Sequence, residues 1–308
     1  MKLPVFKAIG ASFAYFMSHG LDLLKALWLP TLLFNAAIIY ALPKYMGPML
    51  AIMELGPTPN PQQAAALMGP ALQWIGVILL AAFVFQPMSY VGAMRHVLRG
   101  QSLRAPFYLG FGADELRVAA AFILMMIMFT LVYVVGALSF VALTAALGAL
   151  AIGAAAPVVL VLGGVFSAVM VWLALRLSLS LAATVAEKKI GLPYSWRAGK
   201  GNSAALLLYF LFWIAVMVPA AALYMMLVMP NYFGDVQALV AAGDDLAKAH
   251  EVQVRMTREQ VEGLAPGSPG FPLRAATIYV YNLFMNALWT VPPAIAYRYL
   301  AADKAQAR

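Results

Sequence analysis

Charged residues are scarce in this chain of 308 residues, because Asp, Glu, Lys and Arg make up 10% of it. Ordinary soluble domains contain about 25%. Hydrophobic residues make up 64%, and residues 118–175 include no charge at all. A helix of about 20 apolar residues crosses the hydrocarbon core of a bilayer, where a charged side chain is costly. The composition therefore excludes an ordinary soluble domain and predicts an integral membrane protein.

Cysteine is absent, which excludes disulfides, thiolate metal sites and cysteine nucleophiles. The sequence also lacks a Gly-x-Ser-x-Gly nucleophile elbow, a Walker loop and a dinucleotide-binding fingerprint. It has only three histidines, at His19, His96 and His250, and their wide separation does not predict a shared metal site. We therefore expect no cofactor, no metal and no enzymatic activity of a familiar kind.

Six apolar stretches are long enough to cross a membrane, so we expect an all-α, polytopic protein with a single membrane domain over residues 1–308. The N-terminal residues lack the uninterrupted apolar core and the cleavage site of a signal peptide, so the first span is expected to be retained. The expected spans are 23–42, 71–97, 116–149, 156–186, 203–229 and 273–300.

Basic residues cluster in alternate gaps between these stretches. The two termini and the gaps 98–115 and 187–202, with the span ends beside them, hold fourteen of the twenty Lys and Arg residues but five of the twelve acids. Lys and Arg mark the cytoplasmic side of membrane proteins, so both termini are predicted to be cytoplasmic. The positive charge then reflects topology and contact with anionic lipid headgroups at the inner face, and we expect no nucleic-acid binding.

The gap 230–272 is the one long polar segment on the opposite side. Its amphipathic spacing predicts one or two short helices on the outer surface, which offer a docking site for a protein partner. Asp244-Asp245 has the residue type that caps a helix start, and Thr257-Arg-Glu-Gln260 fits a capping box that predicts a start at Thr257. Gly163 and Gly164 form a second candidate partner surface, because small residues let another helix approach closely.

Three segments on the cytoplasmic side share a pattern. In residues 4–10, 106–112 and 193–199, a proline and a glycine are six positions apart with aromatic residues between them. Proline suits the first turn of a helix and glycine its end, so each segment predicts a short interfacial helix before an outgoing span. The chain would then consist of three repeated helical hairpins. The alternative is chance, because these residue types are common at membrane interfaces.

A family resemblance lies in the segment Arg176-Leu-Ser-Leu-Ser-Leu-Ala-Ala-Thr-Val-Ala-Glu-Lys-Lys, followed by Pro193-Tyr-Ser-Trp-Arg197 and Lys200-Gly-Asn. It resembles the bacterial glycerophosphoryl diester phosphodiesterase membrane domain and related uncharacterised six-helix membrane proteins. This resemblance implies a multi-pass protein of the bacterial cytoplasmic (inner) membrane. It does not imply diesterase activity, because that family name comes from fusions to a soluble barrel. The Leu-Ala-Ala-Thr portion departs from the pattern, which has a proline there.

Arg176 is the one ionisable residue well inside an apolar stretch. Such a residue is a candidate functional group, and its guanidinium suits bidentate binding of an anionic group such as a lipid phosphate. The alternatives are that the side chain reaches the inner headgroups or fixes helix packing. Arg197 and Lys200 follow on the cytoplasmic side and are candidates for the same lipid contact.

Several amides interrupt the apolar stretches. Each either bonds a neighbouring helix or lines a polar groove that contacts a ligand. Asn35 and Gln86 are lone polar residues in the first two stretches. Four residues of the last stretch are spaced to share one helix face: Asn282, Asn286, Trp289 and Pro293.

Three function classes remain open, and we expect the first. A non-enzymatic scaffold or accessory subunit that binds lipid or a membrane partner needs only a packed interior. A transporter or flippase of a lipid or amphiphile needs a cavity reaching mid-membrane, lined by Arg176 and the amides of the last stretch. A membrane enzyme acting on lipid needs titratable groups such as His96, Asp114 and Glu115 to converge in a pocket near the inner headgroups.

Overall fold

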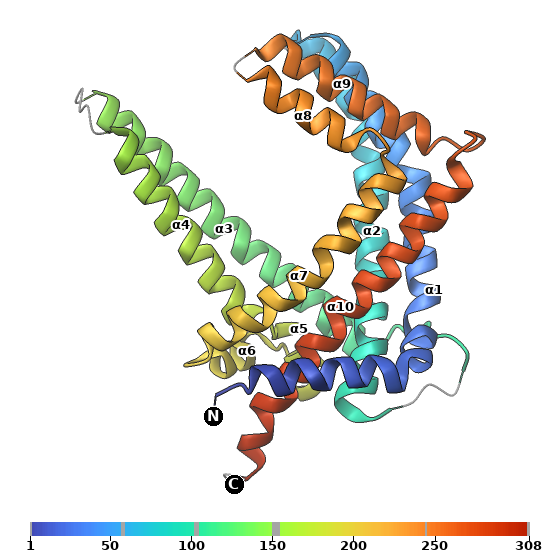
Figure 1. Ribbon diagram of the computed structural model, residues 1–308, viewed down its shortest axis with the longest axis vertical. Coiled ribbons are helices and arrows are strands. Elements are labelled where there is room, and N and C mark those ends of the chain that lie inside the picture. The colour runs from blue at the N-terminus through green and yellow to red at the C-terminus, as the bar shows by residue number, and fades with distance from the viewer. Residues whose placement is uncertain (1, 57–58, 102–104, 150–154, 244, 307–308) are drawn as a thin grey trace.

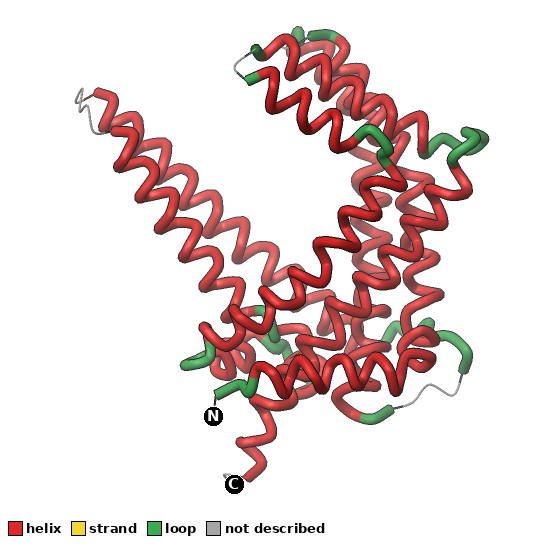
Figure 2. The backbone as a smooth tube through the Cα atoms, viewed as in Figure 1, coloured by secondary structure: helices red, strands yellow, loops and turns green. Residues whose placement is uncertain are grey.

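The computed structural model describes residues 2–56, 59–101, 105–149, 155–243 and 245–306. Within these residues the regular structure is entirely helical, as the sequence predicts (Figure 2). The helices are α1 (Val5–Glu54), α2 (Pro61–Arg99), α3 (Ala113–Ala149), α4 (Ala155–Leu177), α5 (Ser180–Glu187), α6 (Leu192–Gly199), α7 (Ser203–Val228), α8 (Tyr232–Ala242), α9 (Leu246–Gly263) and α10 (Phe271–Gln306).

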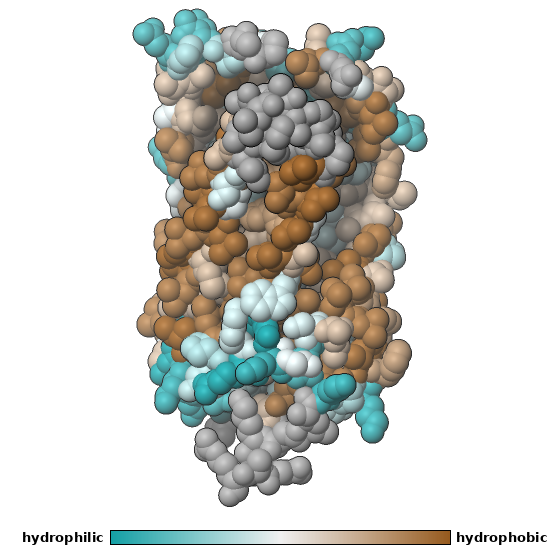
Figure 3. All heavy atoms as spheres, turned by 90° about the vertical axis from the view of Figure 1, so that its left-hand side faces the viewer, coloured by the Kyte–Doolittle hydropathy of each residue, from teal (hydrophilic) through white to brown (hydrophobic). Residues whose placement is uncertain are grey.

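Five stretches of the described chain are long and apolar enough to cross a membrane, and they fit a multi-pass membrane protein. They lie in α1, α2, α3, the consecutive helices α4 and α5, and α7. The surface in Figure 3 shows a broad apolar band between polar ends. The helix α10 is equally long but falls outside this set. Its two asparagines, four tyrosines and adjacent prolines lower its hydropathy.

The long helices form two arms that meet at one end, so the molecule is V-shaped in Figure 1. The α3–α4 hairpin is one arm and stands apart from the other long helices over most of its length. The helices α1, α2 and α10 pack together in the other arm, with α7 against α10. Where the arms meet, α5 contacts α2, α3 and α10. At this same end α1 begins and α10 ends.

The helix α1 consists of two segments joined at His19, whose backbone angles (φ −127°, ψ 20°) are not helical. The first segment crosses the base of the molecule, and the second runs along α2 to the far end (Figure 1). In the first segment Ala8 and Ser12 are buried, whereas Phe6 and Met17 are 82% and 87% exposed. An exposed apolar face on a helix lying across the bundle is typical of a segment in a membrane surface.

The three proline-to-glycine segments differ in structure. Residues 4–10 form the start of α1 and residues 193–199 lie in α6, but residues 106–112 form no helix. Tyr108 instead turns inward, where its hydroxyl bonds to Arg95 and Glu115 and so ties this loop to α2 and α3. The described chain therefore has the start of a long helix, one short helix and one loop at these positions, and the threefold repeat stays a prediction.

The far end of the molecule is helical over much of the gap expected between the first two spans. The helix α1 continues to Glu54 through Pro43 and Pro48, and α2 begins at Pro61. Asn60 caps α2 by accepting a hydrogen bond from the amide of Gln62 (2.9 Å). These ends extend beyond the expected spans, and the extended end of α1 supports α9.

The capping signals of residues 230–272 have different outcomes. Asp245 caps α9, because its carboxylate accepts a hydrogen bond from the amide of Lys248 (3.2 Å). Asp244 lies outside the described residues. The predicted helix start at Thr257 is wrong, because Thr257 lies inside α9 and donates to the carbonyl of Gln253 (2.9 Å). A threonine hydroxyl bonds the carbonyl four residues back when the helix already continues on both sides.

Candidate functional site

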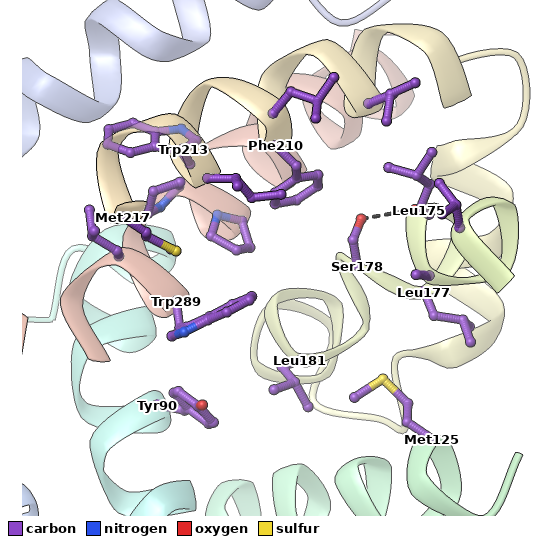
Figure 4. Close-up of a pocket in the computed structure, with 18 of the residues that line it drawn as sticks. Tyr90, Met125, Leu175, Leu177, Ser178, Leu181, Phe210, Trp213, Met217 and Trp289 are labelled. Atoms are coloured by element: carbon purple, nitrogen blue, oxygen red, sulfur yellow. Dashed lines mark hydrogen bonds between the residues drawn. The ribbon is translucent and has the colours of Figure 1, made fainter. Parts of the chain in front are cut away.

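A cavity of about 590 Å³ lies where the two arms meet. Its walls come from α2, α3, α4, α5, α7 and α10, and Figure 4 shows Tyr90 and Trp289 facing Ser178 and Leu181 across it. No lining residue is charged, and polar side-chain atoms come only from Tyr90, Ser178, Trp213 and Trp289. The volume is typical of small-molecule sites, which span roughly 300–1,000 Å³. The lining suits an apolar ligand.

A break between α4 and α5 shapes one wall of this cavity. At the break, Ser178 donates to the carbonyl of Leu175 (2.8 Å; Figure 4). The amide of Leu179 donates to Oγ of Ser195 (3.2 Å). Ser195 in turn donates to the carbonyl of Arg176 (2.7 Å). These bonds satisfy backbone groups that an unbroken helix would have paired, so the chain can turn away and leave the space open.

The opposite wall contains the adjacent prolines of α10, Pro292 and Pro293. Behind them, the buried hydroxyl of Tyr209 donates to the carbonyl of Pro292 (3.0 Å). The same hydroxyl bonds Oγ of Ser12 (2.9 Å) in the first segment of α1. Tyr209 therefore ties α1, α7 and α10 together behind the cavity and holds this wall in place.

A second cavity, of about 250 Å³, lies between α1, α2 and α3. It shares Tyr90 and Phe122 with the first cavity, so these two side chains form a common wall. Gln86, one turn before Tyr90 on α2, is the other polar residue of its lining. The Oε1 atom of Gln86 is buried and has no hydrogen-bond partner among the described residues.

The predicted lipid contact Arg176 does not line either cavity, although its neighbours Leu175 and Leu177 line the larger one. Its guanidinium donates to the carbonyl of Trp196 (3.2 Å) and lies 5.4 Å from the ring centre of Trp196 and also of Trp172. In the described chain, no acidic side chain forms an ion pair with it. This geometry joins α4 to α6 and favours the helix-packing interpretation of Arg176.

Arg197 and Lys200 lie near Arg176, at the end of α6 and just after it. Both are exposed. Arg197 donates to the carbonyl of Pro193 (3.2 Å), and its guanidinium lies 4.9 Å from the ring centre of Tyr194. The three predicted basic contacts therefore gather at one corner of the molecule, outside both cavities.

Asn282 and Asn286 belong to a separate place, the contact between α10 and α1. Asn282 donates to Oδ1 of Asn35 (2.6 Å), and Asn286 donates to Oγ1 of Thr31 (3.0 Å). These bonds support the interpretation of the amides as interhelix contacts. Two further residues expected on the same face, Trp289 and Pro293, line the larger cavity instead.

An ion-pair network joins the end of α2 to the start of α3. The carboxylate of Asp114, which is 6% exposed, accepts from Arg95 (2.8 Å), Arg99 (2.7 Å) and Arg117 (2.8 Å). Glu115 is fully buried, lies 3.4 Å from Arg95 and accepts from the amide of Gly112 (2.9 Å). Both carboxylates are thus neutralised by guanidinium groups or backbone donors, and neither lines a cavity described above.

Tyr108 closes this network from the loop before α3. Its hydroxyl accepts from Arg95 (2.6 Å) and donates to Glu115. Burial raises the pKa of Tyr108, and the bond to Glu115 raises it further. The phenol therefore stays protonated and acts as a fixed donor, which stabilises the buried carboxylate.

His96 does not join Asp114 and Glu115. It faces α1, where the hydroxyl of Tyr15 bonds its Nδ1 and Asp22 lies 3.7 Å from its Nε2. The ring of His19 is 5.2 Å away. Within the residues that the structure describes, no group of three or more His, Cys, Asp or Glu side chains could hold a metal ion. Within the described structure, His96 therefore does not converge with Asp114 and Glu115 in the arrangement that the sequence suggested.

The helices α8 and α9 cap the far end of the molecule (Figure 1). Arg258 pairs with Glu54 at the end of α1 (2.9 Å), and Nε2 of His250 bonds the carbonyl of Met53 (2.8 Å). Between the two helices, Arg255 pairs with the buried carboxylate of Asp235. The hydrogen bond to Asp235 raises the pKa of Arg255. The helices α8 and α9 are thus held to each other and docked onto the end of α1.

The small-residue face of α4 is open. A Cβ atom built at Gly163 or Gly164 meets nothing within 4 Å. By contrast, Gly136 of α3 receives the ring of Phe166, which a Cβ there would overlap at 2.0 Å. The ring of Phe166 therefore packs against α3 at Gly136, whereas the space beside Gly163 and Gly164 is open.

Comparisons of the chain with protein-family models, with curated proteins and with solved structures found no match. Function is therefore inferred from the two cavities and from the polar groups around them. Sequence reasoning missed most of the cavity residues, because an apolar side chain that faces a cavity has the same pattern as one that faces lipid. The cavity residues that it did single out were Gln86, a lone amide in an apolar stretch, and Trp289 and Pro293 in the last stretch.

Proposed function

We propose that this chain is a non-enzymatic integral membrane protein that binds a lipid, as a scaffold or accessory subunit of the membrane. The observation that carries this proposal is the cavity of about 590 Å³ between the α3–α4 hairpin and the helices α7 and α10. Its lining offers almost no partners for water, and an apolar cavity of this kind binds apolar ligands. In a bilayer, the apolar molecules at hand are lipid chains.

The proposal includes six spans, with α10 as the sixth. Its two amides lower its hydropathy, but both are bonded to α1 and so need no water. The end of the molecule that holds α6 exposes Lys188, Arg197 and Lys200. By the positive-inside rule this end faces the cytoplasm, with both termini, and its basic side chains meet anionic headgroups. The resemblance of residues 176–202 supports a bacterial inner membrane.

A transporter or flippase of a lipid is the second candidate. The adjacent prolines Pro292 and Pro293 favour it, because they line the cavity and each removes a backbone N–H donor from α10, the helix that would have to move. The charges and amides that such a path needs lie elsewhere, since Arg176 and Asn286 line neither cavity. A lipid-modifying enzyme is the third candidate, and the pairing of Asp114 and Glu115 with arginines weighs against it.

Filling the cavity tests the proposed function. Ala174 lines the cavity on α4, and Ala174→Trp places an indole in the space that the lipid chain would occupy. Ala168→Trp is the matched control, because Ala168 is exposed on the same helix and lies outside the lining. Lipid retained after purification in mild detergent is measured by native mass spectrometry. We expect Ala174→Trp to lose retained lipid and the control to keep it. Equal retention in the two variants contradicts the proposal.

A further inference from the structure

Two polar side chains without protein partners face the second cavity. The buried Oε1 atom of Gln86 has no hydrogen-bond partner, and the hydroxyl of Tyr90 likewise forms no hydrogen bond among the described residues. The rest of the lining is apolar. An unpaired polar group away from water is unfavourable, especially inside a bilayer. A few converging polar groups in an apolar pocket are the arrangement that orients a bound ligand.

Tyr90 stands at the junction of the two cavities. It lines both of them together with Phe122, and Figure 4 shows it at the edge of the larger one. Gln86 lies one helical turn away, so both polar side chains lie on the face of α2 that lines the second cavity. Because Tyr90 and Phe122 border both cavities, a molecule whose polar centre lies beside Tyr90 has a cavity on each side for an apolar arm, of about 590 and 250 Å³.

The polar centre of such a molecule has to be uncharged. Neither lining includes an Asp, Glu, Lys or Arg side chain. Gln86 also precedes Arg95 by nine positions on α2, which places it roughly 14 Å along the helix from the ion-pair network, at about 1.5 Å per residue. A phosphate at that depth would lose its water without gaining a cation, which is strongly unfavourable.

We propose that the two cavities form one binding site for a neutral two-chain lipid of the diacylglycerol class. Its free hydroxyl donates to Oε1 of Gln86, and an ester carbonyl accepts from the hydroxyl of Tyr90. Each acyl chain occupies one cavity. A phospholipid carries a phosphate in place of that hydroxyl and so lacks the donor that Gln86 needs. This inference rests on the proposed function and names its ligand class.

The test uses the full-length protein in phosphatidylcholine nanodiscs. The probes are a diacylglycerol with a photoactivatable diazirine in one chain and the phosphatidic acid with the same two chains. Labelled peptides are identified by mass spectrometry. We expect diacylglycerol to label α2 and α3 at concentrations at least tenfold lower than phosphatidic acid. Gln86→Leu should weaken diacylglycerol labelling about tenfold, which corresponds to about 1.4 kcal/mol, and should leave phosphatidic acid labelling unchanged.

Gln73→Leu is the matched control, because Gln73 is exposed on the same helix and lines neither cavity. The inference is overturned if Gln86→Leu binds diacylglycerol as the wild type does, or if phosphatidic acid binds as tightly. If Ala174→Trp loses lipid but Gln86→Leu binds diacylglycerol unchanged, the proposed neutral ligand is wrong and the proposed function is still supported. Equal lipid retention in Ala174→Trp and in its control, Ala168→Trp, contradicts the proposed function itself.

Thermal unfolding of the lipid-free protein in detergent separates binding from structure. The side chain of Gln86 forms no hydrogen bond within the described protein, so Gln86→Leu is expected to unfold at the same temperature as the wild type or higher. A lower midpoint would assign Gln86 a structural role and overturn the inference.

Discussion

Asp114→Asn removes the negative charge at the centre of the ion-pair network. The variant keeps the size of the side chain and one carbonyl oxygen, so packing is preserved. It leaves the guanidinium groups of Arg95, Arg99 and Arg117 close together, with Glu115 as the remaining carboxylate. We therefore expect a loss of stability that comes from uncompensated positive charge.

The magnitude follows from the exposure of the three partners. Arg117 is 36% exposed and three residues away on the same helix, so its pair contributes at most about 0.5 kcal/mol. The side chains of Arg95 and Arg99 are 25% and 15% exposed, against 8% for that of Asp114. Breaking a fully buried pair costs about 3–5 kcal/mol. Because water still reaches part of both arginines, we expect a loss of about 2–3 kcal/mol.

The assay is the free energy of unfolding from SDS titration in mixed micelles, followed by tryptophan fluorescence. Asp245→Asn is the control, because Asp245 pairs with Lys248 at the surface and asparagine caps a helix as well as aspartate does. The control should change stability by less than about 1 kcal/mol. If Asp114→Asn unfolds like this control, the network does not stabilise the fold, and a chemical role for Asp114 would need to be considered.

Three further predictions concern helix contacts and topology. Asn286→Leu and Thr31→Val should each destabilise the contact between α1 and α10. Their double-mutant cycle, measured by SDS titration, should give a coupling free energy of about 0.6 kcal/mol. If the two changes in the free energy of unfolding simply add, the hydrogen bond is contradicted. Gly191→Ala should lower the free energy of unfolding by about 1–3 kcal/mol, because its Cβ would lie 2.1 Å from the carbonyl oxygen of Ser180. Gly76→Ala is the control and should not destabilise the protein, because a Cβ there meets open space. Equal unfolding midpoints for the two variants would refute this packing. Because the chain lacks cysteine, single variants report topology: Lys248→Cys should react with an impermeant maleimide in intact cells and Lys200→Cys only after permeabilisation. Labelling in the reverse order would contradict the orientation.

The helical class was predictable from the sequence because a bilayer leaves few alternatives. A chain with no charge across residues 118–175 has to satisfy its backbone internally, and helices do this. The pairing role of Asn282 and Asn286 was one of two predicted alternatives, since amides in apolar helices need partners. Their partners Asn35 and Thr31 were not predictable, because the register between α1 and α10 depends on packing.

The loop at residues 106–112 and the two cavities could not be predicted from the sequence pattern. The spacing of Pro106 and Gly112 suits a short helix, but the bonds of Tyr108 to Arg95 and Glu115 hold the chain in a loop. Tertiary contacts overrode a local signal there. The larger cavity depends on the turn between Leu177 and Ser180, and no breaking residue marks that turn. The bonds of Ser195, an apparently ordinary serine of α6, make the turn stable.

The length of α1 sets where the α8–α9 cap stands. After the kink at His19, residues 20–54 rise roughly 50 Å at about 1.5 Å per residue, and the hydrocarbon core is about 30 Å thick. A tilt of about 20° shortens this reach very little. This segment of α1 is therefore longer than the core is thick, and its end holds α9 through the ion pair between Glu54 and Arg258. In the proposed orientation, molecules dissolved in the outer aqueous compartment therefore meet α8 and α9 before they meet the membrane.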